Sequence, residues 1–452
     1  MRRLVTGVLI LGLSAPSFAM GRKPAPSSAL ADQITKSYSA RAEDGLLSGA
    51  SIGVFDSQNT NEPLKLTFGE AKTSQDRFEI GSISKSFTGI LLSKLILEGK
   101  ISLDAPIEDV IPELKGTFVG SVSAHLLATH SARLVDDASG DFQFTDTDLV
   151  TYLKGYSPGE DRPAGERHYS NIGFMTLSLL MSRATGNRFV DLVRNQIFKS
   201  LHMFGSGYLN NKNVFGSILQ PHTALLEDTS YDLLLDVADG AGGVYSNLDD
   251  MSKFLRANLD PQSAPSLTEA IVFSQILGLG WDSAPDASVI WKNGAMTGFG
   301  SIIKMNPATH TGVIVLCNSR CTSSATTLAL IAMGGVDHFM ADLPMSGEAR
   351  ASVVGTYFDS NGKDLIDVVV NSERFLGLHL RETGDPDFYS LRLRKQGENK
   401  FSVYDGLGET ADDFVQFGSD LATGKKQLHY FEWNSQNAHG NPIFTETVFT
   451  QK

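Results

Sequence analysis

The sequence predicts an α+β domain followed by a small all-β domain. Three observations support this prediction: the length, a helical region with strand patterns at both of its ends, and short alternating runs in the C-terminal part. The chain has 452 residues, which fits two or three domains at roughly 100–200 residues each. Hydrophobic residues make up 41% and charged residues 20% of the chain, and such proportions are typical of folded globular proteins.

The predicted α+β domain has strand patterns early and late in its sequence and helical patterns between them. This order predicts an antiparallel sheet built from early and late segments, flanked by helices and interrupted by an inserted helical subdomain. The expected helices are 28–42, 83–97 and 326–333, the expected strands are 50–55, 64–68, 288–291, 301–305 and 313–316, and residues 103–265 are mostly helical.

The second predicted domain covers residues 346–452. Apolar side chains recur there at every second position, as in strands with one buried face, and turn residues separate the runs. We expect about eight short strands that form a small antiparallel barrel or sandwich. The clearest strand candidates are 376–380, 391–394, 401–403 and 427–433.

The first residues have the pattern of a signal peptide. Arg2 and Arg3 precede an apolar run over 4–15, and small residues follow up to Ala19. A membrane anchor needs roughly 20 apolar residues, so this run is too short to span a bilayer. We therefore expect cleavage after residue 19, an exported protein without a stable membrane anchor, and a first folded domain over 20–345.

Charge and cysteine content exclude several function classes. The net charge of −13 opposes binding to nucleic acid, which needs a basic surface. Two cysteines are too few for a disulfide scaffold or a multi-cysteine metal site. An oxidising compartment would allow Cys317 and Cys321 to pair, but their spacing alone leaves open whether they form a disulfide or stay as two thiols.

Ser82 and Lys85 form the strongest local motif. They lie three residues apart at the start of an expected helix, so their side chains share one face. A serine hydroxyl needs a neighbour that takes its proton, and a partly desolvated lysine suits this role. The helix N-terminus favours negative charge, so the backbone N–H of Ser82 is a candidate oxyanion donor. Because Ser-x-x-Lys also occurs by chance, an ordinary helix start is the alternative.

Two further segments carry residue types that suit the same chemistry. Tyr169 and Asn171 precede a helical run; a phenol near lysines can move a proton, and an amide can hold a substrate carbonyl. Gly294 lies at the edge of an expected strand, where glycine lets the backbone approach a ligand closely. The backbone N–H of Ala295 is therefore a candidate second oxyanion donor.

In this order, these segments resemble the penicillin-recognising serine hydrolases, specifically the class C β-lactamase branch with its related D-peptidases and esterases. The resemblance covers about residues 28–343, and the tyrosine of the second motif favours class C over class A. The last domain resembles the lipocalin-like domains appended to some relatives. The matching motifs are Ser82-x-x-Lys85, Tyr169-x-Asn171 and Lys292-Asn293-Gly294.

The resemblance implies an acyl-enzyme mechanism that requires no metal and no organic cofactor. Ser82 would attack a carbonyl carbon, and Lys85 and Tyr169 would manage the protons. Tyr169 would protonate the leaving amine and later help to activate the deacylating water. The N–H groups of Ser82 and Ala295 would form the oxyanion hole, and Lys292 would attract a substrate carboxylate.

Two departures from the family pattern stand out. Asn293 replaces a usual Thr or Ser whose hydroxyl contacts the substrate carboxylate, and residues 129–134 replace a usual Thr-Ser-Gly-Leu. The amide of Asn293 can still donate a hydrogen bond to a carboxylate, but with a different geometry. His125, His130 and His168 lack metal-binding spacing, so we expect them to be packing or loop residues.

The sequence thus predicts an exported serine hydrolase of the D,D-peptidase or β-lactamase type. Its substrate would be a small molecule or peptide, either a D-amino-acid peptide of peptidoglycan or a β-lactam. A carboxylesterase on the same scaffold is the alternative within the enzymes. A non-catalytic module that binds wall peptides is the alternative from another class.

Overall fold

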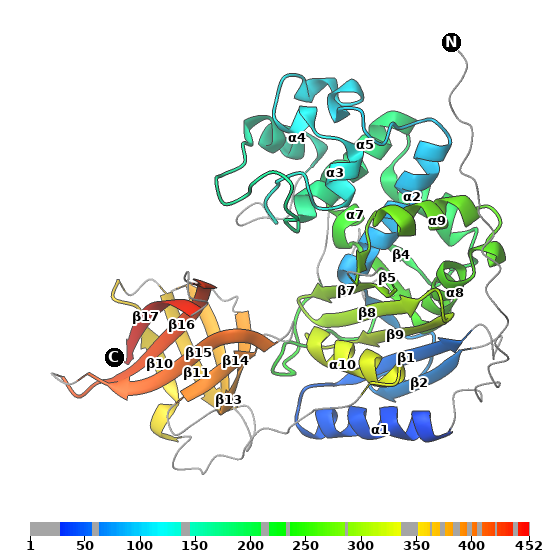
Figure 1. The fold of residues 1–452 in the computed structure, drawn as a ribbon. Helices are drawn as coiled ribbons and strands as arrows, with labels where there is room; N and C mark the ends of the chain where they lie inside the picture. Colours follow the sequence, from blue (N-terminus) through cyan, green and yellow to red (C-terminus); the bar gives the residue numbers. More distant parts are fainter. Residues whose placement is uncertain are drawn as a thin grey trace.

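The computed structural model places the chain in a large mixed α/β body and a smaller β-barrel, which lie side by side (Figure 1). The large body is built from segments between Ser28 and residue 335, and the barrel from segments after residue 354. The structure describes residues 28–56, 63–136, 145–208, 217–231, 236–284, 288–335, 351–361, 364–370, 376–382, 389–395, 400–404, 409–420, 423–436 and 442–451.

An antiparallel sheet forms the centre of the large body. Its strands lie in the order β2-β1-β9-β8-β7-β6 in the described part of the chain. Ile52 of β1 is opposite Val315 of β9, so an early and a late segment of the chain lie side by side. The strands are β1 (Gly49–Asp56), β2 (Leu64–Gly69), β6 (Asp282–Ser283), β7 (Ile290–Met296), β8 (Phe299–Asn306) and β9 (Thr311–Cys317).

Helices cover both faces of this sheet (Figure 1). On one face, α1 (Ser28–Glu43) and α10 (Thr322–Ala332) pack in a core that includes Ile34, Ile52 and Leu328. On the other face, α8 (Leu248–Leu259) contacts β1 and β9. Strand β9 is apolar over nearly its whole length because both of its faces are covered.

The helical subdomain is inserted between β2 and β6. Its core joins that of the sheet, and α2 (Ser84–Leu97) runs through it with almost every residue buried. The other helices are α3 (Ala124–Ala128), α4 (Asp146–Gly155), α5 (Asn171–Thr185), α6 (Phe189–Val193), α7 (Asp239–Gly242) and α9 (Thr268–Leu277); the 3-10 turns are η1 (Gly81–Ile83), η2 (Ile107–Asp109), η3 (Pro112–Leu114), η4 (Val119–Ser121), η7 (Asp236–Ala238) and η8 (Pro261–Ser263), and η5 (Arg194–Phe198) is a π-helical turn.

A small sheet that the sequence did not predict supports the segment before Ser82. Its strands are β3 (Arg77–Glu79), β5 (Val244–Asn247) and β4 (Gly207–Tyr208), in that order. They are three, four and two residues long, which is too short for an alternating pattern to show in the sequence.

The C-terminal body is a closed antiparallel barrel whose described strands run in sequence order from β10 to β17. Pairing of Tyr357 with Gln451 closes it, and its apolar core forms a cluster separate from those of the large body. The strands are β10 (Gly355–Phe358), β11 (Asp364–Val370), β12 (Leu376–Glu382), β13 (Tyr389–Lys395), β14 (Lys400–Tyr404), β15 (Glu409–Ser419), β16 (Lys426–Gln436) and β17 (Pro442–Gln451).

Residues 217–231, which we call the linking loop, belong to the large body and contact the barrel. His379 Nε2 of β12 lies 3.1 Å from Glu227 Oε1. A Cβ atom built on Gly377 would lie 2.3 Å from Leu225 Cδ1, so β12 lies directly against the loop at this glycine. The loop therefore provides both an apolar and a polar contact to the barrel.

The same loop is anchored to the large body through His222. The backbone N–H of His222 donates to the carbonyl oxygens of Asn318 and Gly298, at 3.1 and 3.3 Å. Its Nε2 lies 3.0 Å from Glu70 Oε2. The linking loop thus touches the turn between β7 and β8, next to the third motif.

The predicted fold class is confirmed: an antiparallel sheet flanked by helices, an inserted helical subdomain and a C-terminal β-barrel. Of the two predicted all-β forms, a barrel or a sandwich, the C-terminal domain is a closed barrel. The expected signal peptide and the expected domain boundary at 345 lie outside the described residues. None of the described helices is long and apolar enough to span a bilayer.

Candidate active site

Ser82 lies in η1, directly before α2. Gly81, just before it, has a φ of 49°, in the left-handed region that favours glycine. A Cβ atom on Gly81 would lie 2.8 Å from the backbone nitrogen of Ala295. Glycine therefore allows strand β7 to approach the turn, and this brings the backbone of Ala295 next to Ser82.

Lys85 is fully buried in the first turn of α2. Its Nζ donates to Ser82 Oγ at 3.0 Å and to the carbonyl oxygen of Ala241 at 2.8 Å. It also donates to Asn171 Oδ1. A buried ammonium group needs such acceptors because leaving water is costly. These partners hold the lysine against the serine hydroxyl.

Tyr169 completes the arrangement, with its hydroxyl oxygen 2.6 Å from Ser82 Oγ. Ser170 follows as the N-cap of α5, and its hydroxyl accepts a backbone N–H of the first turn. The backbone N–H of Asn171 donates to the carbonyl oxygen of Asp136 at 2.9 Å, and its Nδ2 donates to Asp136 Oδ1 at 3.1 Å. Tyr169 and Asn171 thus flank the N-cap residue Ser170, and the hydrogen bonds at the start of α5 hold both of them in place.

Strand β7 forms the opposite side of the site. Lys292 is buried, and its Nζ lies 5.0 Å from the centre of the Tyr169 ring. A Cβ atom on Gly294 would lie 2.0 Å from the carbonyl oxygen of Ile80, so glycine is needed for this close approach. Asn293 lies between Lys292 and Gly294 and is exposed.

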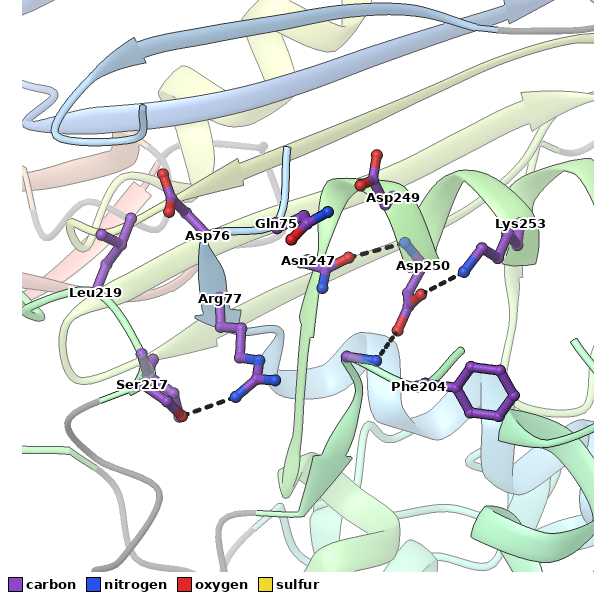
Figure 2. Close-up of a pocket in the computed structure, with 12 residues that line it drawn as sticks. Gln75, Asp76, Arg77, Phe204, Ser217, Leu219, Asn247, Asp249, Asp250 and Lys253 are labelled. Carbon is purple, nitrogen blue, oxygen red and sulfur yellow. Dashed lines mark hydrogen bonds and ion pairs between the residues drawn. The ribbon is translucent and has the colours of Figure 1, made fainter. Parts of the chain in front are cut away.

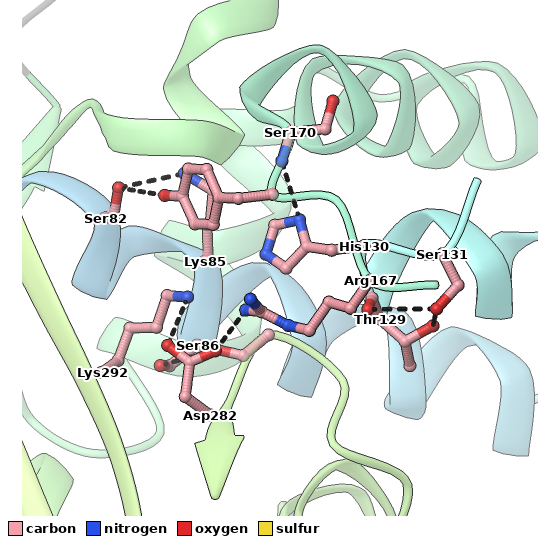
Figure 3. A network of polar contacts seen from close by, with 12 residues as sticks. Ser82, Lys85, Ser86, Thr129, His130, Ser131, Arg167, Ser170, Asp282 and Lys292 are labelled. Atoms are coloured by element: carbon pink, nitrogen blue, oxygen red, sulfur yellow. Dashed lines mark hydrogen bonds and ion pairs between the residues drawn. The ribbon is translucent and has the colours of Figure 1, made fainter. Parts of the chain in front are cut away.

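Two charged residues whose role the sequence did not reveal lie beside Lys292 (Figure 3). Asp282 Oδ2 lies 2.9 Å from Lys292 Nζ, and Arg167 forms an ion pair with the other oxygen of Asp282. Asp282 belongs to β6, whose pairing places it opposite Trp291. This pairing was not predictable from a two-residue strand, so the sequence held no signal for the contact.

His130 packs against the tyrosine, in line with the expectation that it is a packing or loop residue. Its ring stacks on the Tyr169 ring with 4.5 Å between the centres. Its Nδ1 accepts the backbone N–H of Ser170 at 3.1 Å, and its carbonyl oxygen accepts the N–H of His168 at 2.8 Å. The sequence did not indicate these contacts, because residues 129–134 are where it departs from the family motif.

Burial and neighbouring charges shift the titration of two groups in the site. Burial lowers the pKa of Lys292, and the nearby Asp282 opposes this shift. Burial lowers the pKa of His130 strongly, and the positive charges of Lys292, Lys85 and Arg167 add to the effect. His130 is therefore neutral at neutral pH.

A hydroxyl that is hydrogen-bonded to both a lysine and a phenol, with two backbone N–H groups close by, suits nucleophilic acyl transfer. A family model described as Beta-lactamase matches residues 41–332. The chain belongs to the Beta-lactamase family. The match includes all three motifs and ends before the barrel.

Curated relatives within the Beta-lactamase family share a modest level of identity. Protein flp of Staphylococcus aureus strain MRSA252 is 23% identical over 270 residues, which cover 54% of this chain and 52% of that protein. The chain thus spans about half the length of that relative. The beta-lactamase of Yersinia enterocolitica is 26% identical over 310 residues, which cover 55% of this chain and 76% of that protein.

Solved structures confirm the Beta-lactamase fold. A class C beta-lactamase in complex with cefoxitin aligns with a TM-score of 0.61 and 22% identity, covering 68% of this chain and 99% of that one. A beta-lactamase/D-alanine carboxypeptidase from Pseudomonas syringae aligns with a TM-score of 0.61 and 21% identity over the same shares.

A hollow in this Beta-lactamase family member, lined by none of the motif residues, lies between β3 and the start of α8 (Figure 2). Its volume is about 560 Å³. Two of its cationic side chains have partners: Arg77 donates to the neutral Ser217 Oγ at 2.9 Å, and Lys253 Nζ forms an ion pair with Asp250 Oδ1 at 2.8 Å. We assign no chemistry to it.

Both cysteines are free thiols and buried. A hydrogen bond with Cys321, followed by burial, raises the pKa of the Cys317 thiol. The described residues contain no cluster of three or more His, Cys, Asp or Glu side chains that could hold a metal ion.

Proposed function

We propose that this protein is an exported serine hydrolase that acts through an acyl-enzyme on Ser82. The observation that carries the proposal is the hydrogen-bonded unit of Ser82, Lys85 and Tyr169, with oxygen–oxygen and nitrogen–oxygen distances of 2.6 and 3.0 Å. A serine hydroxyl becomes nucleophilic when positioned neighbours take its proton. The signal-peptide pattern at the N-terminus supports export.

The proposed reaction has two steps. In the first, Ser82 Oγ attacks the carbonyl carbon and gives its one proton to the pair of Lys85 and Tyr169, one of which must be deprotonated before the attack. The backbone N–H groups of Ser82 and Ala295 stabilise the oxyanion, and Tyr169 returns a proton to the leaving group. In the second step, water attacks the acyl-enzyme and the same groups move the protons in reverse order.

The proposed substrates are D-amino-acid peptides of peptidoglycan, or β-lactams. In this proposal the Asn171 amide holds a substrate amide carbonyl, and Lys292 and Arg167 provide positive charge for a carboxylate. Asn171 accepts from Lys85 through Oδ1, and Lys292 and Arg167 both pair with Asp282. The names of the structural relatives, a beta-lactamase/D-alanine carboxypeptidase and a cefoxitin complex, agree with this class.

An esterase is the second candidate, and a specific observation favours it. Asp282 neutralises part of the charge of Lys292 and Arg167, and Asn293 stands where the family uses a hydroxyl. Both features weaken binding of a substrate carboxylate. Rapid turnover of p-nitrophenyl butyrate without labelling by fluorescent penicillin would favour the esterase over the peptidase.

Covalent labelling tests the proposed function. A fluorophosphonate probe and fluorescent penicillin are each incubated with the wild type, Ser82→Ala and Ser217→Ala. Ser217 lines the hollow between β3 and α8, so its variant is a matched control. We expect labelling of the wild type and the control and none of Ser82→Ala. Absence of any Ser82-dependent adduct would instead support the non-catalytic binding module.

Mass spectrometry of peptidoglycan fragments after incubation then identifies the substrate. Loss of a terminal D-alanine, dependent on Ser82, is the result expected for a carboxypeptidase. Unchanged fragments together with hydrolysed p-nitrophenyl butyrate would replace the peptidase proposal with the esterase.

A further inference from the structure

One residue outside the three motifs contacts three consecutive residues around the tyrosine of the site. The carbonyl oxygen of His130 accepts the N–H of His168 at 2.8 Å. Its ring stacks on Tyr169 with 4.5 Å between centres and an interplanar angle of 30°. Its Nδ1 accepts the N–H of Ser170 at 3.1 Å. His130 thus holds His168 through its backbone, and Tyr169 and Ser170 through its imidazole.

The imidazole is neutral and has one defined tautomer. Because Nδ1 accepts an N–H, the proton of the neutral ring is on Nε2. The charged groups that face it are Lys85, Lys292 and Arg167, all positive, and His130 is only 4% exposed. A protonated ring would lose the Ser170 hydrogen bond, because Nδ1 would then be a donor.

We propose that His130 is a positioning residue that holds the Tyr169 hydroxyl at hydrogen-bond distance from Ser82. The proposal rests on the proposed acyl transfer at Ser82. It gives a role in that reaction to a residue of 129–134, the stretch that departs from the family motif. Phe174 packs on the same imidazole, with ring centres 5.1 Å apart, so the ring of His130 is itself held in place. His130 does not touch Ser82, so it acts through Tyr169.

The backbone of His130 provides a clean way to test this role. Its φ is 62°, a left-handed conformation that glycine adopts without strain. Histidine-to-glycine replacement therefore removes the imidazole while the backbone conformation stays accessible. The cavity left behind has the size and shape of imidazole, so added imidazole can occupy it.

The experiment measures acylation of Ser82 by p-nitrophenyl butyrate or fluorescent penicillin in the wild type and His130→Gly. We expect the maximal acylation rate of His130→Gly to fall by about ten- to a hundredfold, because small misplacements of catalytic groups cost that much. The probe concentration for half-saturation should stay unchanged. Added imidazole should restore the rate, and the rescue should follow the neutral fraction of imidazole as pH changes.

His130→Phe separates the two contacts, because it keeps an aromatic ring on Tyr169 and removes the acceptor for Ser170. We expect a smaller loss of rate than in His130→Gly and no rescue by imidazole. His125→Phe is the control; His125 is a partly exposed histidine on α3. Wild-type acylation rates in both His130 variants, or a loss in His130→Gly that imidazole leaves unchanged, would overturn the proposal.

Failure of the proposed function gives a different result from failure of this inference. A wild type that no probe labels disproves acyl transfer, whereas a labelled wild type with unaffected variants disproves only the role of His130. Nitrogen-15 NMR of the histidines adds a readout that needs no activity. We expect the imidazole signal that is lost in His130→Phe to keep its proton on Nε2 from pH 5 to 8; a protonated His130 ring at pH 6 would contradict the inference.

Discussion

At the scale of single residues, Asp282 offsets part of the positive charge of Lys292 and Arg167 in the site. It pairs with the buried Lys292 at 2.9 Å and with Arg167. Asp282→Asn keeps the shape and removes the charge, which leaves the ammonium of Lys292 without its anion. We expect the free energy of unfolding to fall by about 3–5 kcal/mol. Urea unfolding at pH 7 measures the change.

The matched control is the double variant Asp282→Asn with Lys292→Met, which removes both charges. We expect it to regain much of the lost stability, because a buried pair replaced by neutral groups often costs little. A double variant as unstable as Asp282→Asn alone would show that shape, and not charge, is what Asp282 contributes.

His130 makes a prediction about pH and stability. A histidine in an unfolded chain titrates at about pH 6.5, whereas burial lowers the pKa of His130 in the folded protein. Below about pH 6.5 the unfolded state therefore binds a proton that the folded state does not, and stability falls as pH falls. The slope contributed is at most about 1.4 kcal/mol per pH unit.

Denaturant unfolding of the wild type and His130→Phe between pH 5 and 8 measures this contribution. We expect the stability of the variant to decline less from pH 6.5 to pH 5 than that of the wild type. Equal declines in both proteins would mean that His130 is protonated in the folded state.

Single residues also show how far sequence reasoning reaches. Ser82, Lys85, Tyr169 and Asn171 were all candidates from their motifs, and the structure brings them into one hydrogen-bonded group. Asp282 was missed because its contact depends on strand pairing between β6 and β7, and pairing is a property of the fold and not of local sequence.

At the scale of elements, the close approach of β7 to η1 decides whether the site forms. A Cβ atom on Gly294 would lie 2.0 Å from the carbonyl oxygen of Ile80 and 2.6 Å from Ser301 Oγ. Gly294→Ala should therefore push the strand away from the turn, lower the melting temperature and reduce acylation of Ser82 at least tenfold, as misplaced catalytic groups do.

Gly155→Ala is the matched control for this prediction. A Cβ atom on Gly155, the last residue of α4, meets nothing within 4 Å. We expect unchanged acylation and an unchanged or slightly higher melting temperature, because alanine favours helices over glycine. Equal effects of the two substitutions would contradict the argument from close approach.

The elements themselves were predictable where their patterns were long. The strands β1, β8 and β9 and the helix α2 lie close to their expected positions, because they are buried along most of their length and are therefore apolar runs in the sequence. Strand β7 extends five residues beyond its expected end at 291, over the third motif. Strands of two to four residues left no pattern, which is why the small sheet was missed.

At the scale of the whole molecule, the barrel has an apolar core of its own. The buried residues of the barrel form one cluster, and those of the large body form two others. We therefore expect calorimetry to show the barrel unfolding as a separate transition. Val415→Ala, at a fully buried barrel position, should lower the free energy of unfolding of the barrel by about 1–3 kcal/mol and so lower the temperature of that transition.

Acylation of Ser82 is the second measurement on this variant. We expect the rate to stay at the wild-type level at temperatures below the barrel transition. A single transition that shifts as a whole, or acylation lost together with the barrel, would show that the two bodies fold as one unit.

The linking loop bears on how such proteins exchange domains during evolution. Its contacts through His222 to Asn318, Gly298 and Glu70 belong to the large body, so the loop keeps its anchors whatever domain follows the large body. The barrel meets it at Leu225 and Glu227. Recombination that replaced the barrel with another module would need to refit this small contact, while the residues around Ser82 kept their supports.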